Sequence, residues 1–214
     1  MECRSTERRQ WIVNNYNVVP MAHIQLLAGQ VKHSDAGAMI ENDYYIFHAT
    51  DKVNGRRECI QCGRGAARDF LRLIKHKGLP LFNPLNGKGG AGIGNSEGKG
   101  VRKTAEIWNP VAQQLLNAIM WIILIIDAEP DTPIFDIKKK VYRFKDREPF
   151  DSQVKAVNTI IGKNLGGRTL TEVIDKLRAN NNVRDNMCQF ERLVDIINNY
   201  TDKDGNRVEL EVYF

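Results

Sequence analysis

Residues 44–62 read YYIFHATDKVNGRRECIQC, and this stretch decides the fold class. Its first seven positions are rich in aromatic and β-favouring side chains, which predicts a strand over residues 44–50. Asn54-Gly55 follows, and both residues tolerate the positive φ that a tight hairpin turn requires. Residues 57–60 are expected to return as the second strand. The sequence therefore predicts a β-hairpin that carries the pair Cys59 and Cys62.

Helical patterns surround this hairpin. Residues 66–77 repeat apolar side chains at helical spacing and stop at Gly78, a residue type that commonly ends helices. Asn109-Pro110 has the form of a helix start, because Asn caps free NH groups and Pro fits the first turn. The apolar run behind it predicts a buried helix to about residue 127. Further helices are predicted over residues 20–31, 150–161, 169–177 and 183–200.

Two other stretches are predicted as strands. Residues 134–144 have a strand-like composition around three consecutive lysines. Residues 208–214 place Val208, Leu210, Val212 and Phe214 at alternate positions, which predicts a strand with one solvated face. With the hairpin, these segments give an α+β fold, mainly helical with a small antiparallel sheet. We expect a single domain over residues 1–214.

The net charge of +5 hides a local concentration of positive charge. Residues 52–103 contain twelve Lys or Arg against three Asp or Glu, so this segment carries +9 and the rest of the chain −4. A basic segment in an otherwise slightly acidic chain favours an anionic partner.

Six basic residues of this segment are the candidate contacts for such a partner. Clustered Lys and Arg side chains supply the sequence-independent part of nucleic-acid affinity through phosphates. Basic residues three or four positions apart on a helix also share one face. The alternative interpretation is a solvated surface paired with acids from elsewhere in the chain. We predict a nucleic-acid-binding protein, with DNA and RNA not distinguished, whose contacts are Arg56, Arg57, Arg64, Arg68, Arg72 and Lys75.

The cysteine pair suggests a zinc site that stabilises the hairpin. A structural zinc needs four ligands, and Cys59 with Cys62 supplies only two. His48 is expected on the opposing strand and His76 near the end of the next helix, so these four side chains form the candidate set. The competing interpretation is a pair of ordinary thiols, since a single CxxC is a weak motif.

The glycine-rich stretch 86–100 contains seven glycines in fifteen positions, which predicts a mobile loop or a backbone cradle for a ligand. Residues 88–92 resemble the start of a phosphate-binding loop, but Ile93 stands where that loop needs its lysine. We therefore expect residues 52–103 to form a basic hairpin, helix and mobile loop. Asp43, Asp51 and Glu58 flank the hairpin and form a weaker candidate site for a divalent metal.

Two other functions remain open at this point. The same basic surface suits an enzyme acting on nucleic acid or on a phosphorylated small molecule, with the glycine-rich loop closing over the substrate. It also suits a non-catalytic accessory protein that docks on an acidic protein partner. Self-association as a homo-oligomer is a further expectation, through the helix over 183–200 or the edge of the last strand.

The expected compartment is the cytoplasm, and no membrane partner is expected. The N-terminal residues are charged and are not followed by a long apolar run, so no secretory signal is visible. The most apolar stretch, residues 115–126, is too short to cross a bilayer.

Overall fold

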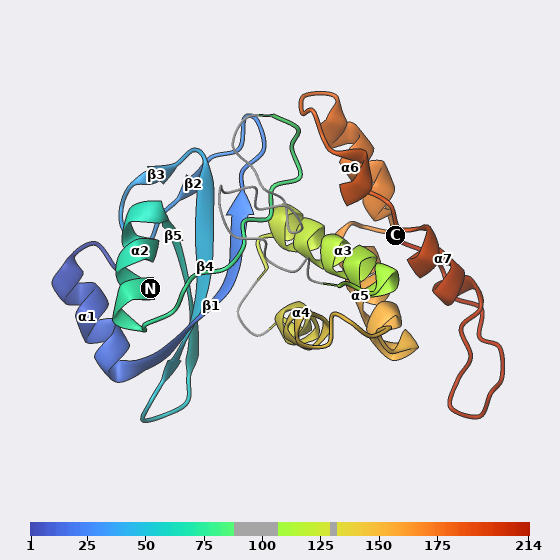
Figure 1. Ribbon diagram of the computed structural model, residues 1–214, viewed down its shortest axis with the longest axis horizontal. Coiled ribbons are helices and arrows are strands. Elements are labelled where there is room, and N and C mark those ends of the chain that lie inside the picture. The colour runs from blue at the N-terminus through green and yellow to red at the C-terminus, as the bar shows by residue number, and fades with distance from the viewer. Residues whose placement is uncertain (88–106, 129–131) are drawn as a thin grey trace. The chain divides into compact units, whose positions relative to one another are not determined.

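The predicted hairpin forms the centre and one edge of an antiparallel sheet (Figure 1). In the computed structural model, which describes residues 1–87, 107–128 and 132–214, the hairpin strands are β4 (Asp43–Asp51) and β5 (Arg57–Gly63). The third strand, β1 (Tyr16–Gln25), pairs with β4, so the order is β1-β4-β5. The α+β fold class is confirmed.

The chain divides into two compact units, each described by itself below. The sheet unit comprises Met1–Lys99 with Glu129–Asp131, and the helical unit comprises Gly100–Ala128 with Thr132–Phe214. The single domain over residues 1–214 stays a prediction. The glycine-rich stretch 86–100 lies almost entirely outside the described residues.

Strand β1 contains a β-bulge that changes which side chains face each side of the sheet. Val18 and Pro20 pair with Ala49 and Phe47, but after the bulge Ala22 pairs with Ile46. One extra residue in β1 therefore turns every later side chain to the opposite face. Pro20 fits here because β1 is an edge strand, where a missing NH group costs little.

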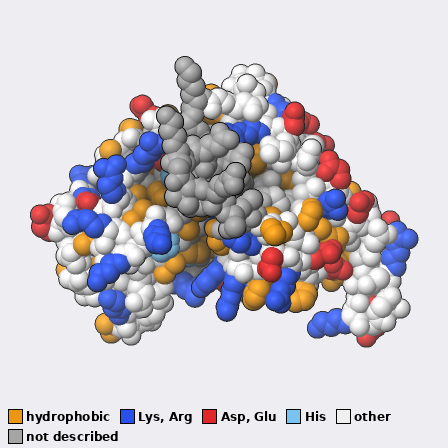
Figure 2. Space-filling model, in the orientation of Figure 1, with side chains coloured by type: hydrophobic (Ala, Val, Ile, Leu, Met, Phe, Trp, Pro, Cys, Tyr) orange, Lys and Arg blue, Asp and Glu red, His pale blue; other side chains and the backbone are white. Residues whose placement is uncertain are grey.

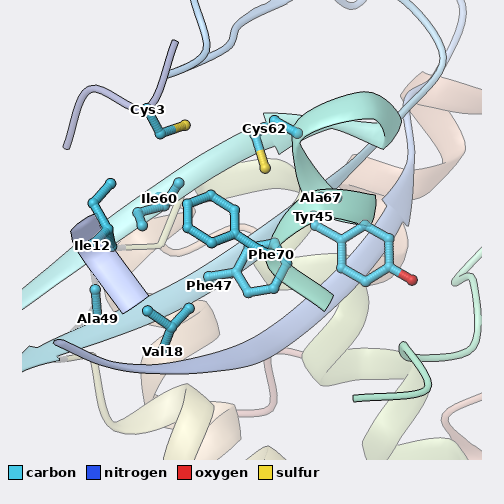
Figure 3. Close-up of a cluster of buried hydrophobic side chains, with 11 residues drawn as sticks. Cys3, Ile12, Val18, Tyr45, Phe47, Ala49, Ile60, Cys62, Ala67 and Phe70 are labelled. Carbon is cyan, nitrogen blue, oxygen red and sulfur yellow. The ribbon is translucent and has the colours of Figure 1, made fainter. Parts of the chain in front are cut away.

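Two helices cover one face of the sheet, α1 (Thr6–Asn15) and α2 (Arg64–Leu73) (Figure 1). The core between them is dominated by aromatic side chains, and Phe47 of β4 lies 5.3 Å from Phe70 of α2, measured between ring centroids. Full burial of each such side chain contributes roughly 1.5–3 kcal/mol. Figure 3 shows this cluster, which consists of Cys3, Ile12, Val18, Tyr45, Phe47, Ala49, Ile60, Cys62, Ala66, Ala67 and Phe70.

A buried arginine joins the two helices. Arg9 of α1 is only 8% exposed, and its Nε and Nη2 atoms donate to Asp69 Oδ2 of α2 at 3.0 and 2.7 Å. Its third nitrogen donates to the carbonyl oxygen of Cys3 at 2.7 Å. Because every arm of the guanidinium has a partner, the pair fixes the position of α2 over the sheet.

The helical unit is built around α3 (Pro110–Ile126), which packs against α4, α5 and α7. Asn109 Oδ1 caps α3 by accepting from the NH of Val111 at 2.9 Å, as its sequence predicts. Among the described helices, α3 included, none is both long and apolar enough to cross a membrane. The remaining helices are α4 (Pro133–Arg143), α5 (Asp151–Asn164), α6 (Leu170–Arg178), the 3-10 turn η1 (Asp185–Met187) and α7 (Glu191–Asn198).

Three segments differ from the sequence predictions. Residues 20–31 were expected to be helical, but most of this segment belongs to β1 and the loop behind it. Residues 134–144 are helical rather than extended, because Thr132-Pro133 starts α4 and places Ile134 and Val141 on its buried side. The helix over 183–200 is shorter, since η1 and a loop precede α7.

The C-terminal tail, residues 208–214, lies against helices instead of pairing with a strand in the described part of the chain. Asn158 of α5 replaces the strand partner: its Nδ2 donates to Glu211 O and its Oδ1 accepts from Tyr213 N, both at 2.7 Å. The NH of Leu170 donates to Tyr213 O, also at 2.7 Å. The predicted strand over residues 208–214 is therefore wrong, because alternation of side chains cannot show which groups satisfy the backbone of the segment.

Gly162 of α5 provides a test of this docking. A Cβ at this position would lie 2.5 Å from the Tyr213 ring, so Gly162→Ala must displace that ring from α5. We expect a loss of roughly 1–3 kcal/mol in the free energy of unfolding, measured by urea denaturation.

In a Tyr213→Ala protein, Gly162→Ala should raise the free energy of unfolding by roughly 0.5–1 kcal/mol. The clash with the ring is absent there, and Ala is more favourable than Gly inside a helix. An equal loss in both backgrounds would show that the tail does not pack on Gly162.

Candidate functional site

A basic pocket lies in the sheet unit, along one side of α2. Its volume is about 410 Å³, and we call it the α2 pocket. Helix α2 forms one wall, two side chains of the sheet contribute from β1 and β4, and the chain behind α2 contributes the rest. Its lining residues are His23, Tyr45, Arg64, Ala67, Arg68, Leu71, Arg72, His76 and Lys77.

The helix supplies three arginines to this pocket because of their spacing. Arg64, Arg68 and Arg72 are four residues apart, so they stand on successive turns of one face. The core side of α2 carries Ala66 and Phe70 instead. Lys and Arg side chains gather on the visible face of this unit, with histidine surface among them (Figure 2).

A buried carboxylate anchors the first of these arginines. Asp43 begins β4, and its side chain is fully buried. Its Oδ1 forms an ion pair with Arg64 Nε at 2.5 Å, and its Oδ2 is hydrogen-bonded to His23 Nε2 at 2.6 Å. One carboxylate thus joins β1, β4 and the first turn of α2.

The pKa of Asp43 reflects these contacts. Burial alone would raise it, but the hydrogen bond with His23 and the positive charge of Arg64 outweigh burial. The pKa of Asp43 therefore lies below its ordinary value of 3.8, and the group is a carboxylate at neutral pH.

His23 faces this carboxylate only because of the bulge in β1. His23 pairs with Tyr45 across the two strands, so its side chain lies on the same face of the sheet as Asp43. Without the extra residue of the bulge, the His23 side chain would lie on the opposite face. Its ring stacks on Tyr45 with centroids 4.0 Å apart. Its Nδ1 lies 3.3 Å from the carbonyl oxygen of Leu79, so both ring nitrogens are engaged inside the protein. His23 therefore serves to position Asp43 and offers no open nitrogen to a ligand.

The chain directly after α2 supplies another part of the pocket lining. The NH of His76 donates to Leu71 O at 2.9 Å, and Lys75 adopts a left-handed conformation with φ of 53°. The NH of Gly78 donates to His76 Nδ1 at 2.9 Å, which fixes that imidazole. This turn brings His76 and Lys77 into the pocket. The sequence prediction instead chose Lys75, which does not line it.

The other predicted nucleic-acid contacts lie elsewhere. Arg57 starts β5 and Arg64 follows its last residue, so a strand of seven residues separates them. At about 3.3 Å per residue, this places Arg56 and Arg57 on the order of 20 Å from the start of α2. The structure therefore groups Arg64, Arg68 and Arg72 and separates the hairpin pair from them.

The four candidate zinc ligands do not come together. Cys59 and Cys62 are three residues apart on β5, so they point to opposite faces of the sheet. Cys59 pairs with His48, while Cys62 is buried in the core, where burial raises its pKa and keeps it a thiol. His76 lies behind α2. Across the three described stretches, no three His, Cys, Asp or Glu side chains are grouped as metal ligands.

Two of the three candidate acids near the hairpin, Asp43 and Asp51, lie at opposite ends of one strand. Asp43 and Asp51 begin and end β4, a strand of nine residues. Asp43 is engaged by Arg64 and His23, while Asp51 Oδ1 accepts from the NH groups of Val53 and Asn54 in the hairpin turn. Both carboxylates therefore have structural roles in the described chain.

A family model matches residues 2–201, which is most of the chain. The chain belongs to this family, described as Uncharacterised conserved protein UCP028583. The match includes every residue that lines the α2 pocket. Neither the curated proteins nor the solved structures contain a match.

The Asp43 cluster makes a prediction about pH. Asp43→Asn removes the buried negative charge that Arg64 and His23 contact, and we expect it to lower the free energy of unfolding by roughly 3 kcal/mol at pH 7. Because the folded pKa is below the ordinary value, this stability is present above about pH 4 and lost as pH falls through the folded pKa.

Urea denaturation of both proteins from pH 7 to pH 3 measures the effect, with the exposed Asp195→Asn as the matched control. The difference in the free energy of unfolding between wild type and Asp43→Asn should become smaller below about pH 4. A difference that stays constant with pH would contradict a charged Asp43 in the folded protein.

Proposed function

We propose that the sheet unit binds nucleic acid through the α2 pocket, with Arg64, Arg68 and Arg72 contacting phosphates. The observation that carries the proposal is that these three arginines and Lys77 line the same pocket. Phosphate contacts from Lys and Arg dominate nucleic-acid affinity, and the guanidinium fork suits phosphate oxygens.

The balance of charge around the pocket supports this proposal. Arg64 forms an ion pair with Asp43, and Arg72 lies 3.7 Å from Asp69. Each carboxylate offsets part of the positive charge of its arginine, and the rest is available to a ligand. Both arginine side chains are 66% exposed. Arg68 and Lys77 have no acidic partner among the residues that the structure describes. The pocket therefore keeps positive charge for a ligand.

A phosphorylated small molecule is the second candidate. The pocket volume of about 410 Å³ falls within the range of ordinary small-ligand sites. A ligand of this kind would use the same cations but would not need a polynucleotide chain. The two candidates therefore differ in whether affinity grows with the length of the bound strand.

Charge reversal on α2 tests the main proposal. In Arg68→Glu/Arg72→Glu, repulsion replaces two phosphate contacts. We expect Kd for short single-stranded and double-stranded DNA and RNA to rise by at least about a hundredfold, roughly tenfold per contact. Fluorescence anisotropy at low and moderate salt measures the affinity and its salt dependence.

Arg192→Glu/Lys203→Glu, a pair of exposed charge reversals in the helical unit with the same total change of charge, is the control. It should leave Kd within about threefold of wild type, a change of well under 1.4 kcal/mol. Retention of full affinity by the α2 double variant, or equal losses in the two proteins, would rule out α2 as the binding surface.

A further inference from the structure

The helical unit exposes two phenylalanines in the connection between α4 and α5. Phe144 directly follows α4 and is 46% exposed, and Phe150 directly precedes α5 and is 76% exposed. Phe135, which α4 carries on its core side, is buried instead. A single exposed apolar side chain is ordinary on a protein surface. Two exposed rings within residues 144–150 are a local concentration that the packing of the helical unit does not require.

Two arginines flank the first of these rings. The guanidinium carbons of Arg143 and Arg147 lie 5.3 and 5.9 Å from the centroid of the Phe144 ring. Neither guanidinium forms an ion pair within the described part of the chain. The C-terminus of a helix favours basic residues, which accounts for Arg143 in the last turn of α4. It does not account for Arg147, which lies beyond the helix, or for the exposed ring that both arginines approach.

A second group of rings adjoins the first along the chain. Trp108 and Tyr142 meet edge to face with centroids 5.7 Å apart, and Lys145 Nζ lies 5.7 and 5.4 Å from those centroids. The carbonyl oxygen of Lys145 accepts from the NH of Asn109 at 2.8 Å, which holds the chain before α3 against the connection. Figure 2 shows hydrophobic and basic side chains next to one another where Figure 1 places α4. We call the combined surface the α4–α5 patch; it consists of Trp108, Tyr142, Arg143, Phe144, Lys145, Arg147 and Phe150.

This combination of groups matches an unpaired strand of nucleic acid. Such a strand presents flat bases and charged phosphates in alternation, and its bases are free to stack on aromatic side chains while Lys and Arg contact the backbone. An acidic protein surface offers the charge without flat ring faces. A lipid surface takes up apolar side chains whether or not they are aromatic.

We propose that the α4–α5 patch binds unpaired bases of a nucleic-acid strand, with Phe144 and Phe150 stacking on bases and Arg143 and Arg147 contacting neighbouring phosphates. This inference rests on nucleic-acid binding as proposed above. It adds a second contact surface, in the other unit of the chain, and it adds bases to the phosphates as the groups that are recognised.

The test separates bases from phosphates. Full-length protein is titrated at moderate salt with a labelled single strand of deoxythymidines and with an abasic strand of the same length, which has the same phosphates. The wild type should bind the thymidine strand at least about tenfold more tightly, because stacking on the rings is lost with the bases. Phe144→Leu/Phe150→Leu keeps apolar side chains but removes both rings, and it should reduce this ratio to within about threefold.

Two further variants serve as controls. Phe144→Trp/Phe150→Trp retains a ring at each position and should keep the ratio of the wild type. Trp11→Leu is matched to the leucine variant, because Trp11 of α1 is 45% exposed and has the Arg8 guanidinium 4.2 Å from its ring. It should also keep the ratio, since Trp11 lies outside the patch.

The outcomes separate this inference from the proposed function. Equal affinity of the wild type for both strands overturns base recognition and leaves phosphate binding by the α2 pocket intact. Absence of binding to either strand overturns both. A ratio that survives in the leucine variant, or that falls as far in Trp11→Leu, overturns the patch as the place where bases bind. Tighter binding of the wild type to phosphatidylserine vesicles than to either strand, lost in the leucine variant, would assign the rings to a lipid surface and overturn the inference as well.

Discussion

The carboxylate of Asp43 is the contact on which the site depends. It is fully buried, and isolated burial of a charge is costly unless partners compensate it. His23 from β1 and Arg64 from α2 provide that compensation. Because the two partners come from different elements, the same contact fixes the first turn of α2 against the sheet. The arginines one and two turns further on are then aimed at the pocket by helix geometry alone.

A single extra residue in β1 makes this contact available. The bulge behind Pro20 turns His23 to the face that carries Asp43 and Tyr45. Bulges commonly re-aim a side chain beside a functional site, and the edge position of β1 tolerates both the bulge and the proline. Arg9 adds a second fixed point, since its pair with Asp69 holds α2 against α1. The basic face of α2 is therefore a rigid feature of the sheet unit.

Local sequence signals predicted the parts of the fold that depend on local chemistry. The Asn54-Gly55 turn, the Asn109-Pro110 helix start and the Thr169 capping box all appear in the structure. Residues 20–31 were misjudged because a bulge disturbs the period of two, and residues 134–144 because a lysine run obscured the start signal at Thr132-Pro133. The bulge depends on strand pairing, which no local pattern contains, whereas Thr132-Pro133 is a local signal that the prediction did not use.

The sequence predicted only part of the candidate site, because local spacing does not contain the contacts between elements. Spacing along the predicted helix over 66–77 grouped Arg68 and Arg72 with Lys75, while Arg64 was predicted as a contact just before that helix. Spacing could not show that His23 joins them, since that depends on strand register. It also grouped Cys59 with Cys62, although the alternation of side chains along β5 sends them to opposite faces.

The most direct test of the account is an NMR titration that follows the Nε–Hε signals of the arginine side chains as a short single strand is added. The account predicts that the signals of Arg64, Arg68 and Arg72 shift or broaden together before one equivalent of strand has been added to the protein. Those of Arg192 and Arg207, in the helical unit, should stay in place. Shifts confined to the helical unit or to Arg56 and Arg57, with the α2 signals unchanged, would contradict it.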